Sequence, residues 1–271
     1  MIYVDKKEEF RETIKMTDKS QTKPSECTAL IVHPTFEKGI LSVIIPSFQK
    51  ERNILITFHN RKPKLYVIKQ EGRGANDNVG LVSWPSGIYL AKYFATLQNN
   101  EVMFKNKNII ELGCGCSPLA SIVLGELGAN VIATDGFESV LNLTTENIYI
   151  NWTQNMHEND SKMPQTSILE WGNRTTVNKL VKDMSFDYIF AADVIYYEKV
   201  HEKLIETLKL LSNNNNKKTI IFLAFQIRLH AFEVDFFKEK LTRHGFHSKI
   251  IWTSMQPPIV KIAEIKLMDL K

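Results

Sequence analysis

The feature that most constrains this chain is a regular alternation of apolar strands and helices, which begins at Asn108 and continues almost to the end. Strands are predicted at 108–113, 130–135, 167–171, 186–194 and 219–225, and helices at 117–128, 139–151, 199–211 and 232–246. Continuous apolar strands between helices are typical of a mostly parallel sheet that is covered on both faces. The runs 248–254 and 262–270 resemble an antiparallel pair. The sequence therefore predicts a doubly wound α/β domain with an antiparallel last strand.

A different pattern precedes this domain. Three β-rich runs, at 39–48, 52–59 and 64–70, are separated by short polar stretches, which favours a small antiparallel layer. We expect an N-terminal tail and a β-rich layer over 1–75, and the α/β domain over 76–271. Near the start of that domain, Pro85 suits the first position of a helix.

Composition narrows the class of protein. The N-terminus has no apolar run after a basic start, and no uncharged apolar run reaches the roughly 18 residues of a membrane helix. Three cysteines are too few for a disulfide framework, which favours a reducing compartment. A formal charge of +4, spread among many acids, gives no clear track for nucleic acid. We expect a monomer in the cytoplasm or nucleus, without a membrane or nucleic-acid partner.

A glycine turn, Glu111-Leu112-Gly113-Cys114-Gly115, follows the first strand of the α/β pattern. Ligands of open parallel sheets bind at the carboxyl ends of the strands. A dinucleotide fingerprint needs a third glycine where this chain has Pro118, and a P-loop needs a lysine that is absent. The turn is therefore not obviously built for a pyrophosphate, which makes a nicotinamide-dependent oxidoreductase the weakest alternative.

An acid ends the next predicted strand. Asp135 lies about 20 residues beyond the turn, where a carboxylate accepts hydrogen bonds from ribose hydroxyls. A ligand with a ribose but no pyrophosphate suits both features, and S-adenosylmethionine is such a ligand. The alternatives are a plain strand-to-helix turn and, for Asp135, a cap of the next helix.

Four short motifs occur in a recognisable order. They are WPSG at 84–87, ELGCG at 111–115, LEWG at 169–172 and DVIY at 193–196. Together they resemble the seven-β-strand protein methyltransferases, a family that includes enzymes modifying lysines of calmodulin, elongation factors and chaperones. The resemblance covers roughly 79–246, and the chain departs from it after Gly115, where Cys116-Ser117-Pro118 replaces a more glycine-rich loop. The segment around Arg228 resembles the branch called methyltransferase-like protein twenty-three.

The resemblance implies a fold, a cofactor and a site. The fold is the Rossmann-like, seven-stranded fold of S-adenosylmethionine-dependent methyltransferases, and the cofactor is S-adenosylmethionine without a metal. The implied cofactor-binding residues are Trp84, Glu111, Gly113, Gly115, Asp135, Trp171 and Asp193, and the implied catalytic residues are Asp193 and Tyr196. For Trp84 and Trp171 the alternative is core packing, and for Asp193 it is a helix cap.

The implied reaction transfers a methyl group to a side-chain nitrogen of a protein, with lysine favoured and arginine or histidine as alternatives. A lysine amine has an ordinary pKa near 10.4 and must lose a proton before it attacks. Asp193 is expected to hold the incoming cation and orient the amine, and Tyr196 to form an aromatic wall. Ordinary packing is the simpler role for Tyr197.

Other polar residues have simpler explanations. Asn147 and Asn151 share one helix face, which suits either a role near the cofactor or a solvated surface. Cys114 and Cys116 lack a nearby histidine pair, so no zinc site is expected. The histidines at 201, 230, 244 and 247 are expected at the surface.

Three other functions remain open at the level of sequence. A nucleic-acid methyltransferase would resemble its family in an Asn/Asp-Pro-Pro-aromatic motif, but this chain has no proline between Asp193 and Tyr196. A small-molecule methyltransferase would share the cofactor residues. The third alternative, from another class, is a catalytically inactive S-adenosylmethionine-binding interaction protein.

Overall fold

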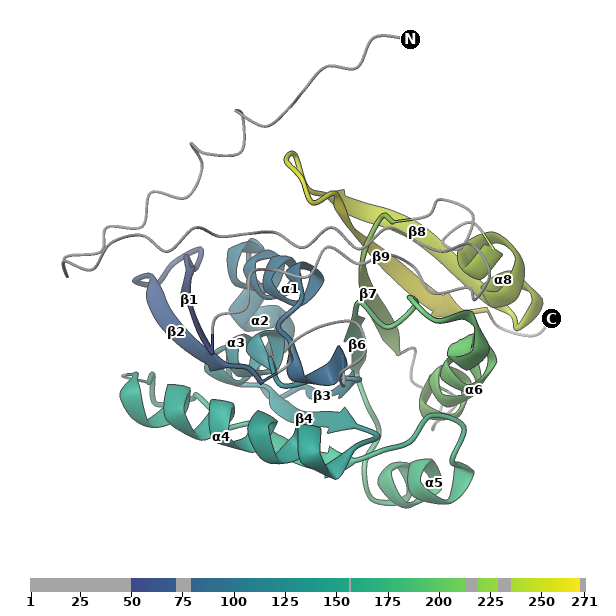
Figure 1. Cartoon of the computed structure of the whole chain (residues 1–271), viewed down its shortest axis with the longest axis horizontal. Coiled ribbons are helices and arrows are strands. Elements are labelled where there is room, and N and C mark those ends of the chain that lie inside the picture. The colour runs from purple at the N-terminus through teal and green to yellow at the C-terminus, as the bar shows by residue number, and fades with distance from the viewer. Residues whose placement is uncertain (1–49, 72–78, 156, 213–218, 229–234, 269–271) are drawn as a thin grey trace, which may run out of the picture.

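The computed structural model describes residues 50–71, 79–155, 157–212, 219–228 and 235–268. The predicted tail and the predicted strand at 39–48 lie outside these ranges. Within them, a seven-stranded sheet forms the centre of the molecule and a two-stranded hairpin lies beside it (Figure 1).

The large sheet confirms the predicted α/β fold. Its strands are β3 (Asn108–Leu112), β4 (Asn130–Asp135), β5 (Gln165–Ile168), β6 (Tyr188–Ala192), β7 (Ile220–Gln226), β8 (Phe246–Thr253) and β9 (Val260–Leu267). Their order is β5-β4-β3-β6-β7-β9-β8. The pairs from β5 to β7 are parallel, and β9 runs antiparallel to both β7 and β8. The chain moves outward from β3 in one direction and then returns to add β6 on its other side, so the switch point lies between β3 and β6.

Helices separate the strands. They are α1 (Pro85–Thr96), α2 (Asn100–Phe104), α3 (Leu119–Glu126), α4 (Glu138–Gln154), α5 (Arg174–Asp183), α6 (His201–Ser212) and α8 (Leu241–Arg243). Short 3-10 turns lie at η2 (Val79–Leu81) and η3 (Glu198–Val200), and η4 (Asp235–Lys240) is a π-helix.

The sequence does not predict the helices α2 and α5, and it places one strand too late. Helix α5 is polar overall and fully buries only Val177, while Leu180 and Val181 pack on the same core at helical spacing. Its apolar residues are regularly spaced but few. A strand is predicted at 167–171, but the observed strand β5 begins and ends earlier, because only Gln165–Ile168 pairs with β4. Trp171 therefore lies beyond the end of β5, in the loop that faces the switch point.

Two apolar cores lie on opposite faces of the sheet. Helices α1, α2 and α3 pack on one face against Ile109, Phe190 and Phe222. Helix α6, with parts of α5, η4 and α8, packs on the other face against Ile110 and Ile189. Successive residues of a strand point to opposite faces, so each buried strand contributes to both cores. All eight residues of α3 are buried. Its two polar residues have partners, since Ser121 donates to Glu111 and Glu126 pairs with Lys64.

The N-terminal hairpin consists of β1 (Glu51–Ile56) and β2 (Lys64–Lys69), which pair in antiparallel fashion as predicted. Ile54, Ile56, Tyr66 and Ile68 point inward and join the core formed by α1 and α3. In Figure 1 the hairpin lies next to α1 and above α4. The hairpin thus shares its core with the α/β domain. The division at residue 75 stays a prediction.

None of the helices among the described residues is long and apolar enough to cross a membrane.

Candidate functional site

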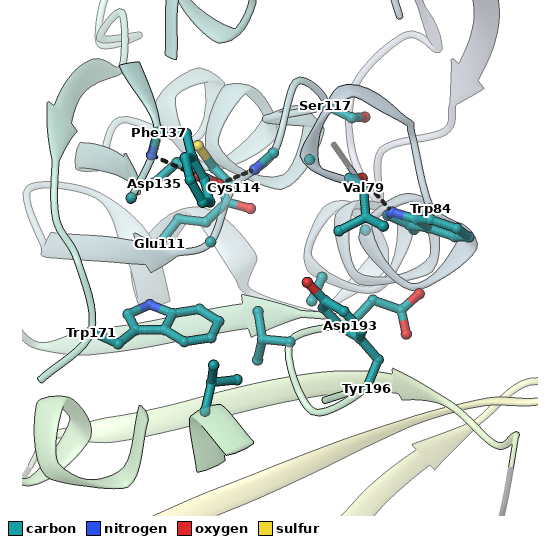
Figure 2. Close-up of a pocket in the computed structure, with 18 of the residues that line it drawn as sticks. Val79, Trp84, Glu111, Cys114, Ser117, Asp135, Phe137, Trp171, Asp193 and Tyr196 are labelled. Atoms are coloured by element: carbon teal, nitrogen blue, oxygen red, sulfur yellow. Dashed lines mark hydrogen bonds between the residues drawn. The ribbon is translucent and has the colours of Figure 1, made fainter. Parts of the chain in front are cut away.

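A pocket of about 490 Å³ opens at the carboxyl ends of β3, β4 and β6, beside the switch point (Figure 2). All eight residues proposed from the sequence for the site line this pocket, namely Trp84, Glu111, Gly113, Gly115, Asp135, Trp171, Asp193 and Tyr196. The parallel sheet brings most of them together because its strand ends meet at one edge, and Trp84 joins them from the start of α1.

The glycine turn forms one wall of the pocket. Gly113 and Gly115 have φ angles of 65° and 57°, a left-handed conformation that side chains other than glycine rarely adopt. A Cβ atom at Gly113 would lie 2.9 Å from Cζ2 of Trp171 and 3.0 Å from Cγ1 of Val194. The turn therefore requires glycine both for its conformation and for the close approach of Trp171.

The departure at Pro118 has a local structural explanation. Pro118 is the N-cap residue of α3, and the preceding backbone is held by the segment η2, where the Cys116 N–H donates to the carbonyl of Gly80 at 2.6 Å. The hydroxyls of Ser83 and Ser117 lie 2.9 Å apart and add a second link. The segment before α1 thus closes over the glycine turn.

Asp135 lies at the end of β4 and faces the pocket. Its Oδ2 accepts a hydrogen bond from the Gly115 N–H at 3.1 Å, and its Oδ1 accepts one from the Phe137 N–H at 3.2 Å, as Figure 2 shows. Burial raises the pKa of this carboxyl, and the backbone N–H donors oppose the rise. The N-cap residue of α4 is Phe137 rather than Asp135, so the capping alternative is wrong.

Glu111 is almost fully buried below the turn. Its Oε2 accepts a hydrogen bond from Oγ of Ser121 at 2.5 Å. Burial raises its pKa to about 8, with Ser121 opposing the rise and the nearby Asp135 adding to it. Glu111 and Asp135 give this half of the pocket two acidic groups, which suits a cationic ligand with hydroxyl donors.

Two tryptophans lie at opposite sides of the pocket in Figure 2. Trp171 packs against the glycine turn and also touches the core under α6. Trp84 is the N-cap residue of α1, and its indole Nε1–H donates to the carbonyl of Val79 at 3.0 Å. Both therefore combine a packing contact with a place in the pocket wall.

Asp193 follows β6 and has a φ angle of 59°, which is uncommon for a residue other than glycine. Its carboxylate forms a two-pronged ion pair with Arg228, with Nη1 to Oδ1 at 2.7 Å and Nη2 to Oδ2 at 3.0 Å. The sequence does not predict this partner. The expected contact of Asp193 with the acceptor stays a prediction.

Tyr196 stands on the same turn as Asp193, and 38% of its side chain is exposed at the mouth of the pocket. Partial burial and the carboxylates of Asp135 and Asp193 raise the pKa of its phenol. Tyr196 therefore stays protonated at neutral pH and offers a hydroxyl and an aromatic face.

Two predictions about polar residues are corrected. Asn147 and Asn151 do not form a solvated face, because both are buried and their amides bond to the backbone of β2. His201 is buried rather than at the surface; its Nε2 lies 2.9 Å from the carbonyl of Ile195, and burial lowers its pKa. The partners of Asn147 and Asn151 lie about 80 residues earlier in the sequence, so the helix pattern does not reveal them. The partner of His201 lies in the irregular segment before α6, which has no recognisable sequence pattern.

The structure adds pocket residues that the sequence does not single out. Phe137 lines the pocket while 62% of its side chain is exposed, and Val79, Ser117 and Lys203 also reach it. Phe137 directly follows the predicted Asp135-Gly136 pair, which is the one sequence signal that would have found it. Among the described residues, no group of three or more His, Cys, Asp or Glu side chains is placed to hold a metal ion.

Comparison with known proteins identifies this architecture. A family model described as lysine methyltransferase matches residues 59–243, which is more than half of the chain. The chain belongs to the lysine methyltransferase family. The match begins inside the N-terminal hairpin and ends at α8, so it includes every residue of the pocket.

The individual proteins that are similar in sequence are named as methyltransferases as well. The protein-lysine methyltransferase METTL21E of Mus musculus is 37% identical over 60% of this chain and 64% of its own length. Methyltransferase-like protein 23 of Dictyostelium discoideum is 31% identical over 60% of this chain and 66% of its own length. The chain spans about half to two thirds of the length of the curated mammalian relatives it matches. The expected branch is thus present among the relatives, alongside a second branch of higher identity.

A solved structure shares the fold. The 16S rRNA methyltransferase of T. thermophilus, in complex with AdoMet and guanosine, is 10% identical, with a TM-score of 0.50 over 83% of this chain and 53% of that chain. At this identity the likeness concerns the fold alone.

The pocket fits the cofactor that this family of folds implies. The backbone of Gly113 and Gly115 lines the pocket, the Asp135 carboxylate lies at the end of β4, and Phe137, Leu169 and Trp171 supply apolar surface for a base. Asp135, Glu111 and these apolar residues are therefore the groups that would hold S-adenosylmethionine.

Proposed function

We propose that this protein is an S-adenosylmethionine-dependent protein methyltransferase that modifies a side-chain nitrogen, with lysine as the acceptor. The observation that carries the proposal is the convergence of the glycine turn, Asp135 and Trp171 with Asp193 and Tyr196 around one pocket. The family supports the choice of lysine, as does the name of the mouse relative.

The two halves of the pocket have different roles. S-Adenosylmethionine, when bound, supplies a methyl carbon on a positively charged sulfur and is released as S-adenosylhomocysteine. Glu111 and Asp135 hold the cofactor in the half that β3 and β4 form, and Trp171 covers its base. Asp193 and Tyr196 define the acceptor half, where they restrict the approach of the nitrogen to the direction of an in-line displacement.

The acceptor nitrogen must be uncharged when it attacks. The N–C bond forms as the C–S bond breaks, and the sulfur keeps the electron pair of that bond. The proton of the acceptor nitrogen leaves to water before the attack, since an ammonium has no free electron pair. The neighbouring positive sulfur favours this loss because like charges repel. The chain therefore needs groups that orient an amine more than it needs a strong base.

The expected partner is a protein, and the remaining partner and location predictions carry over as proposals. We propose a monomer that acts in the cytoplasm or nucleus, without a nucleic-acid or membrane partner. The described cysteines, Cys114 and Cys116, are both free and buried.

Calorimetric titration with S-adenosylmethionine, S-adenosylhomocysteine and NAD tests the cofactor first. We expect micromolar binding of the two adenosyl compounds and none of NAD. Transfer of a radiolabelled methyl group into lysate protein, followed by amino-acid analysis of the labelled band, then tests the lysine acceptor. No binding of either adenosyl compound contradicts the proposal. Binding without transfer favours the inactive interaction protein.

Two substitutions separate the two halves. Asp135→Ala is expected to weaken cofactor binding by at least tenfold, since it removes a hydrogen-bond acceptor for the ribose. Asp193→Ala is expected to abolish transfer while cofactor affinity stays within a few-fold of that of the unmodified chain. A loss of cofactor binding in Asp193→Ala would move that residue out of the acceptor half.

A further inference from the structure

The ion pair between Asp193 and Arg228 joins two segments at the acceptor half of the pocket. Asp193 follows β6 and Arg228 lies two residues beyond β7. Each terminal nitrogen of the Arg228 guanidinium donates to a different oxygen of the Asp193 carboxylate, at 2.7 Å and 3.0 Å. Only 3% of the Asp193 side chain and 10% of the Arg228 side chain are exposed, so the pair is shielded from water. A two-pronged charge-assisted pair of this kind is strong and fixes geometry as well as charge.

Arg228 also touches the cofactor wall. Its guanidinium lies 5.7 Å from the ring centre of Trp84, within the range of a cation–π contact. Trp84 in turn is bonded to Val79, and both residues line the pocket. Arg228 thus connects the acceptor turn with the segment that closes over the cofactor half.

The turn that Arg228 holds is strained. Asp193 has a left-handed φ of 59°, a conformation that persists in a non-glycine residue only where its surroundings enforce it. The Asp193 N–H donates to the carbonyl of Ala224 at 2.9 Å, and the carboxylate bonds to Arg228. In Figure 2 the carboxylate points away from Glu111 and Trp171 and toward the side where Trp84 lies. Tyr196 is carried by the same turn.

We propose that Arg228 is a positioning residue of the acceptor site, which keeps the Asp193 carboxylate in a closed ion pair so that the acceptor nitrogen reacts beside a neutral pair rather than beside a free carboxylate. This inference rests on the proposed methyl transfer. It differs from the expected direct contact between Asp193 and the acceptor cation. A free carboxylate would stabilise the ammonium form, which cannot attack, whereas the closed pair leaves the amine free to lose its proton to water.

Besides Asp193, the charged or titratable groups that line the pocket are Glu111, Cys114, Asp135, Glu170, Tyr196 and Lys203. They remain unchanged in every variant proposed below. A change in the pH dependence between variants therefore reports on Asp193 and Arg228 rather than on these groups.

The test is the pH dependence of kcat for radiolabelled methyl transfer into the labelled lysate protein, measured with the full chain and saturating S-adenosylmethionine. In Arg228→Gln we expect the pH of half-maximal kcat to rise by about one unit, because the free Asp193 carboxylate stabilises the ammonium. In the double variant Asp193→Asn with Arg228→Gln, neither charge of the pair remains. We expect kcat to be strongly reduced, but the pH of half-maximal kcat of the residual transfer to return to that of the unmodified chain. Arg174→Gln, which removes an exposed ion pair with Glu206, is the matched control and should leave the profile unchanged.

Arg228→Lys separates charge from geometry. Lysine keeps the positive charge but cannot form the two parallel bonds of the fork. We expect an unchanged pH profile, a kcat at least tenfold lower, and a calorimetric Kd for S-adenosylmethionine within threefold of that of the unmodified chain. If the melting curve shows that Arg228→Gln does not fold, the test rests on Arg228→Lys. A kcat of Arg228→Lys equal to that of the unmodified chain then overturns the inference.

The outcomes distinguish this inference from the proposed function. No methyl transfer by the unmodified chain contradicts the proposed function, and this inference with it. Transfer by the unmodified chain, together with an unmoved profile in Arg228→Gln, overturns the inference alone. A shift that persists in the double variant also overturns it, because the shift would then not depend on the Asp193 charge.

Discussion

At the scale of single residues, Glu111 is the least conventional group of the pocket. A glutamate side chain that is 98% shielded would be charged at considerable cost, and the Ser121 hydroxyl provides only one hydrogen bond. The pKa of Glu111 therefore rises from its ordinary value of 4.5 to about 8. At neutral pH Glu111 is therefore mostly protonated, and a cationic ligand beside it favours its ionised form.

The raised pKa of Glu111 predicts how stability depends on pH. Between pH 4.5 and 8 the folded protein keeps a proton on Glu111 that the unfolded chain has released. The free energy of unfolding should therefore fall as pH rises through this window, by up to about 1.4 kcal/mol per unit from this group. Glu111→Gln carries no such proton. We expect its stability relative to that of the unmodified chain to increase from pH 5 to pH 8.

Urea denaturation of both proteins at several pH values checks this prediction. Asp135→Asn is the comparison variant. The backbone N–H donors oppose the rise in the pKa of Asp135, so we expect the stability difference of this variant to change less with pH than that of Glu111→Gln. A stability difference between Glu111→Gln and the unmodified chain that stays constant from pH 5 to pH 8 would contradict the raised pKa.

At the scale of elements, the most informative contact is the one between α4 and β2. The Asn151 amide donates to the carbonyl of Val67 and accepts from its N–H, both at 2.7 Å, and Asn147 does the same at Lys69 at 2.8 Å. The two side chains thus take the place of a neighbouring strand along the edge of the hairpin. Asn147 also donates to the carbonyl of Cys116 at 2.6 Å, so the hairpin, α4 and the glycine turn are tied together.

Removal of these amides should weaken the hairpin. In Asn151→Ala the N–H and carbonyl of Val67 lose their partners in a partly buried place, which costs about 1–3 kcal/mol. We expect a loss of this size in chemical denaturation and faster hydrogen exchange at the Val67 amide. Thr153→Ala, on the exposed side of the same helix, is the control. Equal losses in the two variants would show that the amide contacts contribute little.

At the scale of the whole molecule, the pocket joins parts that are far apart in the sequence. Its wall includes residues from before α1, from the ends of β3, β4 and β6, and from α6. A ligand that bridges these parts stabilises the folded chain because it binds the unfolded chain poorly. The fold therefore predicts a strong dependence of thermal stability on the cofactor.

S-Adenosylmethionine at one hundred times its Kd should stabilise the chain by about 2.7 kcal/mol. For a protein of this size, we expect Tm to rise by roughly 5–10 °C. Differential scanning fluorimetry with NAD at the same concentration provides the control, and Asp135→Ala should reduce the rise. An equal rise with NAD would indicate a nucleotide site of a different kind.

The sequence by itself determined the α/β class, the mostly parallel direction of the strands and eight of the residues that line the pocket. These are local matters: apolar runs define strands, and strand ends of a parallel sheet meet at one edge. Helix α5 was not predicted, although Val177, Leu180 and Val181 recur at helical spacing, because the segment is polar overall. Only the tertiary structure decided the partner of Asp193, because an ion pair between the ends of β6 and β7 leaves no signal in either segment alone. It likewise decided the burial of Asn147 and Asn151, since the strand they serve lies about 80 residues earlier in the chain.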